Sequence, residues 1–374
     1  MLAVRGARCL ACSVVVVLLA SAGACRREPA ASDERAQAKP GPERATASEA
    51  ASLVRKDGTI FAETELMGTH VSINLWVGTK GDALAASEAI TDAMTEMARI
   101  EAIASEWRET SDLSRVNRQD GGQGVPVEVP PELVEILGRA AAISADTEGL
   151  FDVSFYSVGQ LWRFEAGSKP PPAEAIAAQL PSVDWRAVEL DAGAGTVALA
   201  KPGMKIGLGA IAKGYAVDRA SALLHERGFA NHIVEAGGDT QVSGKKGAES
   251  WRVGVQDPDE TVGRVGHIVA RDEAVVTSGN YARYFEWDGV HYTHILDPRT
   301  GWPIPVDRSP KSVTLIAQTA TDADAYCTAV SVMTPEQGLA FVEARAQLEA
   351  VIIGPDGQLH VSSGLGERFV REDG

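Results

Sequence analysis

Residues 70–106 read HVSINLWVGTKGDALAASEAITDAMTEMARIEAIASE, and this stretch decides the fold class. In residues 70–77 apolar and polar side chains alternate, and a period of two is typical of a strand with one buried face. From residue 82 to residue 106 apolar side chains recur at helical spacing, which predicts a long amphipathic helix. A strand followed directly by a helix indicates a protein that mixes both kinds of element.

Further along the chain, helical and strand-like segments occur without strict alternation. Helices are predicted after Pro130-Pro131, over residues 211–227, and after the capping box at residues 334–337. Because a doubly wound parallel sheet needs regular βαβ repeats, this order favours an α+β fold. Short β-rich runs are found at 232–235, 251–255, 274–277, 312–317 and 350–353.

The whole chain has 374 residues and a formal net charge of −16. Its 45% apolar and 23% charged residues are ordinary for a globular protein and exclude wholesale disorder. Contact with a nucleic-acid backbone needs clustered Lys and Arg side chains. The acidic balance therefore argues against nucleic acid as a partner.

The N-terminus has the order of an export signal. Arg5 and Arg8 precede a short apolar run, and Cys25 follows the small residues Ala22-Gly23-Ala24. This order predicts a lipoprotein-type signal peptide over residues 1–24, with Cys25 lipidated. The mature protein is then expected outside the cytoplasm, anchored to a bacterial membrane and facing the periplasm. The alternative is a plain secretory signal with an incidental cysteine.

Residues 25–57 are rich in Ala, Glu, Arg and Pro and have no periodic apolar pattern. This composition predicts a flexible tether between the membrane and the folded part. The folded domain is predicted over residues 58–374, a length within the range of one large domain.

Two glycine-containing segments follow predicted strands. Gly237-Gly238-Asp239 combines a backbone that a ligand can approach closely with a carboxylate, although a simple turn explains these residues alone. Thr277-Ser278-Gly279 offers hydroxyl and backbone N–H groups to phosphate oxygens, or forms an ordinary Asx-type or ST-type turn.

Residues 294–301, HILDPRTG, crowd a histidine, an aspartate and an arginine into six positions. His294 lies three residues before Asp297 and is the candidate general base. In the alternative interpretation the segment is a rigid turn in which Arg299 pairs locally. The density of reactive groups favours the functional interpretation.

Asp324 and Thr328 are four residues apart in a stretch with helical character. On a helix they share one face, and a carboxylate with a hydroxyl is a pair of hard oxygen donors suited to Mg²⁺. Two ligands are too few, so backbone carbonyl, substrate phosphate and water oxygens are expected to complete the site. The alternative is that the aspartate only caps the helix.

Read in order, several segments resemble the ApbE family of FAD:protein FMN transferases. Besides the segments above, they are Met67-Gly68-Thr69, SDLSRVN at 111–117, GLFDVS at 149–154 and LGAIAKGYA at 208–216. The resemblance runs from about residue 60 to the C-terminus, with every motif in family order. It implies a T-fold-like α+β architecture in which mixed sheets packed with helices surround one FAD cleft.

The resemblance also implies an activity. Family members use Mg²⁺, cleave FAD, pass FMN to a Thr or Ser hydroxyl of an acceptor flavoprotein and release AMP. The acceptors are subunits of membrane redox complexes and related extracytoplasmic flavoproteins. Two other functions stay open at this point: a FAD pyrophosphatase that yields FMN and AMP, and a non-enzymatic FAD-binding lipoprotein.

Position by position, the resemblance assigns residues of this chain to Mg²⁺ and to FAD. The implied metal ligands are the Ala210 carbonyl, the Asp324 carboxylate and the Thr328 hydroxyl. The residues implied to contact FAD or line its cleft are Met67, Trp107, Leu150, Phe151, Asp152, Gly207, Lys213, Gly237, Gly238, Asp239, Thr277, Ser278, Gly279 and Leu296.

Three positions depart from the family pattern. Gly207 stands where the family has an aspartate that contacts FAD, so this contact is expected to be missing or replaced. Trp107 stands where Tyr is common and can still stack on a ring. Cys327 stands where relatives have Ala or Asp, so a possible extra carboxylate ligand is absent.

Overall fold

The structure, a computed structural model, describes residues 54–78, 81–119, 124–260 and 263–372. The predicted signal peptide, Cys25 and most of the predicted tether lie outside these ranges. The end of the tether belongs to the fold, because Asp57 accepts a hydrogen bond from Thr59 Oγ1 at 2.7 Å and pairs with Lys246 at 2.6 Å. The described residues lie in one compact unit, and none of its helices has the length and apolarity to span a membrane.

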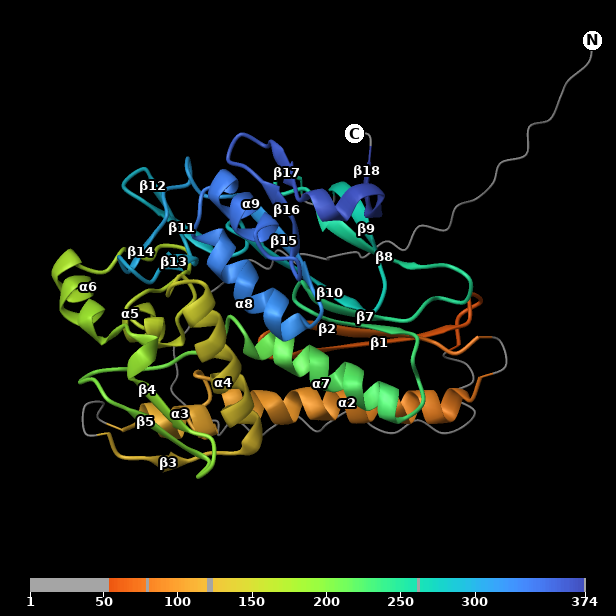
Figure 1. The fold of residues 1–374 in the computed structure, drawn as a ribbon, viewed down its shortest axis with the longest axis horizontal. Helices are drawn as coiled ribbons and strands as arrows, with labels where there is room; N and C mark the ends of the chain where they lie inside the picture. Colours follow the sequence, from red (N-terminus) through yellow and green to blue (C-terminus); the bar gives the residue numbers. More distant parts are fainter. Residues whose placement is uncertain (1–53, 79–80, 120–123, 261–262, 373–374) are drawn as a thin grey trace, which may run out of the picture. The chain divides into compact units, whose positions relative to one another are not determined.

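An eight-stranded antiparallel sheet forms the centre of the fold (Figure 1). Its strand order is β1-β2-β6-β7-β10-β15-β16-β17, so segments far apart in the sequence become neighbours. The register places Val276 of β10 opposite Asp239 of β7, and Leu75 of β2 opposite His232 of β6. The strands are β1 (Thr59–Leu66), β2 (Thr69–Trp76), β6 (His232–Ala236), β7 (Asp239–Ser243), β10 (Glu273–Gly279), β15 (Ser312–Ala317), β16 (Glu349–Ile353) and β17 (Leu359–Val361).

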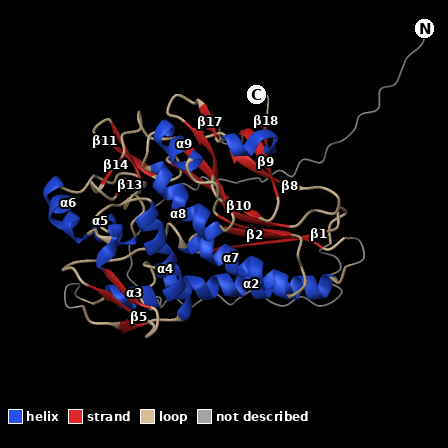
Figure 2. Cartoon of the chain, viewed as in Figure 1, coloured by secondary structure: helices blue, strands red, loops and turns tan. Residues whose placement is uncertain are grey.

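Helices cover one face of this sheet (Figure 2). The long helix α2 (Ala83–Ala104) is capped by Asp82 and turns an apolar stripe that includes Met97 toward the core. Helix α7 (Ala212–Glu226) packs between α2 and α8 (Ala320–Ser331), and α7 and α8 both contact the sheet. The main hydrophobic core lies between this helical layer and the sheet.

A small three-stranded sheet covers the opposite face. It has the order β18-β9-β8, with β8 (Trp251–Gln256), β9 (Arg264–Ala270) and β18 (Phe369–Arg371). Its apolar side chains, such as Trp251, form a second core with residues of the large sheet such as Val275. Because neighbouring residues on a strand face opposite ways, Val275 belongs to this second core and Val276 to the main one.

The remaining elements surround this layered body. A sheet of order β3-β5-β4 and the hairpins β11–β12 and β13–β14 complete the β-structure. Their bounds are β3 (Val127–Glu128), β4 (Val188–Asp191), β5 (Thr196–Leu199), β11 (Tyr284–Trp287), β12 (Val290–Thr293), β13 (Leu296–Asp297) and β14 (Trp302–Pro303). The other helices are α3 (Asp112–Asn117), α4 (Pro131–Asp146), α5 (Tyr156–Gly159), α6 (Ala173–Gln179) and α9 (Pro335–Glu343).

The predicted α+β fold is confirmed. Helices are found at each predicted position, and Thr334 and Gln337 form the predicted capping box at the start of α9. Strand β1 was not predicted, because it is an edge strand whose sequence, TIFAETEL, alternates only weakly.

Candidate active site

The N-terminal ends of α7 and α8 lie against each other and position the candidate site. A Cβ atom on Gly214 would lie 2.2 Å from the Ala320 carbonyl oxygen, so only glycine allows this close approach. Each helix also caps the other. Asp218 of α7 accepts hydrogen bonds from the N–H groups of Ala320 and Thr321, both at 2.8 Å. In return, Asp324 Oδ2 of α8 accepts one from the Gly214 N–H at 3.3 Å.

Lys213 stands at the centre of a buried charged cluster. Its Nζ atom lies 2.8 Å from Asp239 Oδ2 and 3.2 Å from Asp324 Oδ2. These two aspartates are almost fully buried, with 1% and 3% of their surfaces exposed. The structure thus brings together three predicted site residues from three separate segments, hereafter the Lys213 cluster.

The Lys213 cluster holds two carboxylates against one ammonium group. Burial raises the pKa of Asp239 well above its usual value, and the facing carboxylate of Asp324 raises it further. Burial alone lowers the pKa of Lys213, but the two carboxylates outweigh it and the pKa is raised, so the lysine stays charged. Excess negative charge away from water is unfavourable, and a bound cation would compensate it.

Oxygen atoms suited to Mg²⁺ lie next to this excess charge. The Thr328 hydroxyl donates to the Asp324 carbonyl at 3.2 Å, which leaves lone pairs on the hydroxyl oxygen available. The Ala210 carbonyl, just before α7, receives no hydrogen bond from any described residue. Within the described ranges no three His, Cys, Asp or Glu side chains make a metal site by themselves. The predicted carbonyl, carboxylate and hydroxyl donors nevertheless fit a hard cation that also takes substrate and water oxygens.

The turn between β6 and β7 carries Asp239 into the cluster. Ala236 pairs with Asp239 across a two-residue turn, and Gly237 and Gly238 have φ values of 57° and 97°. A hairpin turn with positive φ at both central residues favours glycine, so the turn interpretation of this pair is confirmed. A Cβ atom on Gly237 would also lie 2.3 Å from Thr69 Oγ1, so the pair permits close packing against β2. Contact of these glycines with FAD stays a prediction.

Thr277, Ser278 and Gly279 are the last residues of β10 and not a turn after it. The Thr277 N–H donates to the Gly238 carbonyl at 3.1 Å, so this strand end lies beside the β6–β7 turn. The Thr277 hydroxyl shares a hydrogen bond of 2.9 Å with Thr314 of β15. The prediction of a glycine turn here is wrong because pairing with β15 continues to the end of the segment. A contact with FAD from this strand end stays a prediction.

His294 lies directly after β12, with its ring edge-on to Phe164. Its Nδ1 atom is 3.1 Å from the Arg283 carbonyl, and since a carbonyl only accepts, Nδ1 carries the proton and Nε2 is left as the acceptor. Burial lowers the pKa of His294 to about 4, and the charges of Arg283 and Lys213 add to this effect. The ring is therefore neutral at pH 7 with Nε2 open to accept a proton, and its lowered pKa makes it a weaker base than an ordinary histidine.

Asp297 does not orient His294. Its carboxylate accepts hydrogen bonds from Arg299 Nε at 2.9 Å and from Arg299 Nη2 at 2.7 Å. Its carbonyl accepts the Gly301 N–H at 2.8 Å. The local pairing of Arg299 with Asp297 is therefore confirmed, while the role of His294 as a base stays a prediction. The reason is proximity, because a carboxylate two residues before an arginine reaches it without any long-range contact.

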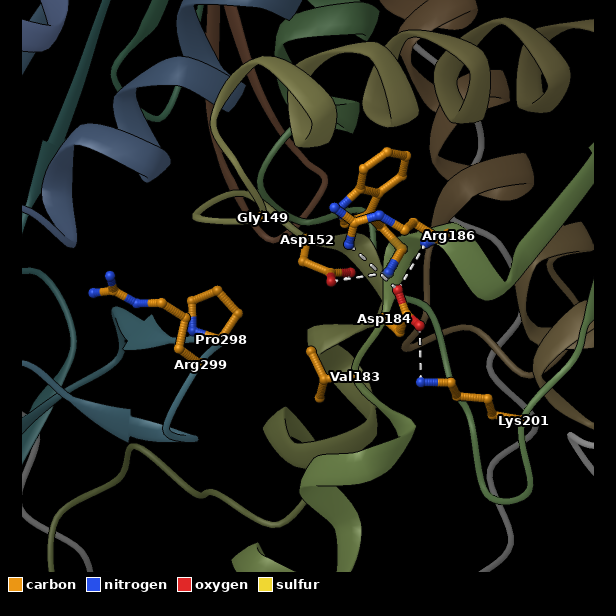
Figure 3. Close-up of a pocket in the computed structure, with 9 residues that line it drawn as sticks. Gly149, Asp152, Val183, Asp184, Arg186, Lys201, Pro298 and Arg299 are labelled. Atoms are coloured by element: carbon orange, nitrogen blue, oxygen red, sulfur yellow. Dashed lines mark hydrogen bonds and ion pairs between the residues drawn. The ribbon is translucent and has the colours of Figure 1, made fainter.

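A pocket of about 280 Å³ brings the 149–152 and 298–299 segments together (Figure 3). The Asp152 carboxylate accepts hydrogen bonds from the Ser154 N–H at 2.8 Å and the Trp185 N–H at 3.0 Å. Asp152 therefore fixes the wall of this pocket, while its contact with FAD stays a prediction. The pocket is lined by Gly149, Asp152, Val183, Asp184, Trp185, Arg186, Lys201, Pro298 and Arg299.

The other predicted FAD residues lie at different depths. Phe151 is buried in the main core, and Leu296 is buried in an aromatic cluster, so both support the fold. Leu150 is half-buried against the main core. Met67 occupies the β1–β2 turn with a φ of 53°. Trp107 is 72% exposed, which leaves its ring open to a ligand.

Contacts between distant segments, which the sequence does not reveal, explain Gly207 and involve two further residues, Glu106 and Asp218. Gly207 is explained by Tyr156, because a Cβ atom at position 207 would lie 2.9 Å from the Tyr156 Cβ. Glu106 and Asp218 were missed as site residues. Their partners, at Gly209 and at the start of α8, lie more than 100 residues away along the chain.

Comparison with known proteins identifies the family of the chain. A model of the ApbE family matches residues 67–352. The chain is 33% identical to the FAD:protein FMN transferase of Treponema pallidum, over 82% of this chain and 88% of that protein. It is 31% identical to a protein of the same name from Klebsiella pneumoniae, over 72% of this chain and 84% of that protein.

Solved structures show the same fold. The ApbE protein of Thermotoga maritima has a TM-score of 0.74 and 34% identity, covering 84% of this chain and all of that one. The flavinyl transferase ApbE of Pseudomonas stutzeri has a TM-score of 0.73 and 26% identity, covering 84% of this chain and 98% of that one. Since the family model spans more than half of the sequence, the chain belongs to the ApbE family.

Proposed function

We propose that this protein transfers FMN from FAD to a Thr or Ser hydroxyl of an acceptor flavoprotein and releases AMP. The Lys213 cluster carries this proposal, because it sets two buried carboxyl groups against a single lysine. A pyrophosphate and a carboxylate pair each need a cation, and Mg²⁺ serves both. The activity named for relatives in Treponema and Klebsiella supports the same reaction.

The proposed reaction breaks one P–O bond and forms another. The acceptor hydroxyl oxygen attacks the phosphorus of the FMN half, and the bond from this phosphorus to the bridging oxygen breaks. AMP leaves with that oxygen, and the hydroxyl proton passes to Nε2 of His294, which is free to accept it. A positioned base of this kind typically contributes about 10²–10⁴-fold to the rate.

The remaining residues prepare the site. Asp324, Thr328 and the Ala210 carbonyl would hold Mg²⁺. When it is bound, this ion would offset the negative charge of the phosphates. Lys213 pairs with both aspartates and fixes their separation. The mutual capping of α7 and α8 sets the positions of all these groups.

One assay tests the proposal. The purified protein is mixed with FAD and Mg²⁺, with and without a purified acceptor flavoprotein subunit of a bacterial membrane redox complex. Flavin bound covalently to the acceptor, with one AMP released per flavin, supports transfer. Free FMN formed equally in both mixtures would identify a pyrophosphatase instead, and bound but intact FAD would identify a flavin carrier.

We also propose that the mature protein is held at a membrane by a lipid on Cys25 and acts outside the cytoplasm. The order of basic, apolar and small residues before Cys25 supports this location. It would also place the site where extracytoplasmic acceptors are found. Replacing Cys25→Ala is expected to release the protein from membranes, and unchanged fractionation of the variant would contradict the anchor.

A further inference from the structure

Glu106 is a carboxylic acid beside the Lys213 cluster that the proposed reaction does not use. It lies in the turn between α2 and α3, and hydrogen bonds hold the backbone of this turn. The Ser111 hydroxyl donates to the Ser105 carbonyl at 2.6 Å, and the Trp107 N–H donates to Ser105 Oγ at 3.2 Å. The direction of the Glu106 side chain is thereby set toward the loop that precedes α7.

That loop leaves room for the side chain. A Cβ atom on Gly209 would lie 3.1 Å from Glu106 Oε1, so glycine allows the carboxyl group to rest on the backbone. Two positions earlier, Tyr156 fills the space above Gly207. The Tyr156 ring stands edge-on to Trp107, with 6.1 Å between ring centres. The carboxyl group and the two rings therefore form one corner of the site.

The carboxyl group of Glu106 has no hydrogen-bonding side chain among the described residues. Burial raises its pKa, while the N–H groups of Leu208 and Gly209 and the charge of Lys213 act in the opposite direction. Lys213 is already bonded to two other carboxylates. The partners of the Glu106 carboxyl group are therefore backbone N–H groups, which leave further lone pairs on its oxygens for a ligand.

We propose that Glu106 is a nucleotide-binding residue, whose carboxyl group accepts a hydrogen bond from an N–H or O–H group of the flavin nucleotide. Trp107 follows directly in the chain and exposes its ring, so the two residues can bind the edge and the face of one planar ligand. Glu106 thereby supplies the carboxyl group that Gly207 lacks. The identity of the ligand rests on the proposed function.

Two substitutions separate hydrogen bonding from packing. Glu106→Met keeps the volume and removes the acceptor, and Glu106→Gln keeps one acceptor oxygen. Calorimetric titration with FAD, AMP and FMN is expected to give a Kd for FAD about 10-fold higher in Glu106→Met, since the hydrogen bond to the carboxyl group is lost. Glu106→Gln is expected to retain part of the affinity. Of the two half-ligands, only the one that carries the contact should bind more weakly.

Glu109→Gln is the matched control, because Glu109 is an exposed glutamate three residues further along the same segment. Its FAD affinity is expected to equal that of the wild type. A wild-type Kd in Glu106→Met would overturn the proposal, and if that variant does not fold, a wild-type Kd in Glu106→Ala would do the same. A wild type that binds FAD but transfers no FMN would refute the proposed function alone, because the comparison of Kd values does not require transfer.

Discussion

The two ends of helix α7 differ in how their polar groups are paired. At the N-terminal end the Lys213 cluster has more carboxylates than cations. At the C-terminal end the chain satisfies its own histidines, since His225 Nε2 is 2.6 Å from Ser243 Oγ and His232 Nε2 is 2.8 Å from Ser221 Oγ. Burial is therefore not what marks the candidate site, because His232 is as fully buried as the two aspartates. The mark is that, among the described residues, two carboxyl groups share one lysine at the N-terminal end.

The largest expected effect comes from removing the lysine. Lys213→Met leaves two facing carboxylates buried without a counter-charge, which should lower the free energy of unfolding by about 3–5 kcal/mol. Urea denaturation at pH 8 measures this loss. If the N-terminal end accepts a cation, several millimolar Mg²⁺ should restore much of the stability of the variant and little of that of the wild type.

Lys201→Met is the control, because Lys201 makes a single, partly exposed pair with Asp184 at 2.9 Å. Its cost should stay within about 1 kcal/mol, and Mg²⁺ should not change it. An equal loss of unfolding free energy in the two lysine variants would contradict a special role of Lys213 at the N-terminal end of α7.

The C-terminal end should respond to pH. Burial lowers the pKa of His232 from 6.5 to about 4, so the unfolded chain binds a proton between these values and the folded chain does not. The stability that His232 contributes is therefore complete above pH 6.5 and is lost as the pH falls, by roughly 2 kcal/mol at pH 5 and about 3 kcal/mol at pH 4. His232→Gln should lose less stability than the wild type between pH 7.5 and pH 5. The same slope in both proteins would contradict the shifted pKa.

Asp324→Asn tests the metal function of the N-terminal end. Asparagine can still accept the Gly214 N–H, so the cap on α7 and the melting temperature should persist. Flavin transfer should fall by about 10²-fold or more, the scale of removing one group that stabilises transition-state charge. A Mg²⁺ titration of the transfer rate is the measurement, with Asp322→Asn as control because Asp322 only pairs with Arg139. Full activity of Asp324→Asn at low Mg²⁺ would exclude the metal function.

The smallest expected effect concerns the exposed aromatic residue. Trp107→Ala removes a ring that nothing in the core needs, so stability should change little. Loss of stacking should weaken FAD binding by roughly 1–3 kcal/mol, by analogy with base stacking on aromatic side chains. Fluorescence titration with FAD measures this loss, and an unchanged Kd would exclude Trp107 from FAD binding.

Local patterns predicted the elements and the segments of the site, but not how the segments join. The strand near residue 73 and the helix that ends before Ser105 were visible because their periods are local. The cap that Asp218 gives to α8 depends on a contact across 102 residues, and no spacing rule records it. The pair of Asp297 and Arg299 was by contrast one of the two alternatives stated from the sequence, because its residues are only two positions apart.

The close approach at Gly214 also brings the N-terminal ends of two helix dipoles together. The N-terminal ends of α7 and α8 both carry partial positive charge, and the glycine lets them converge beside Asp324. Beside the two carboxyl groups of the Lys213 cluster, these peptide dipoles therefore offset part of the negative charge that the single lysine leaves. A larger residue at this position would push the two dipoles apart and weaken that field without touching any ligand.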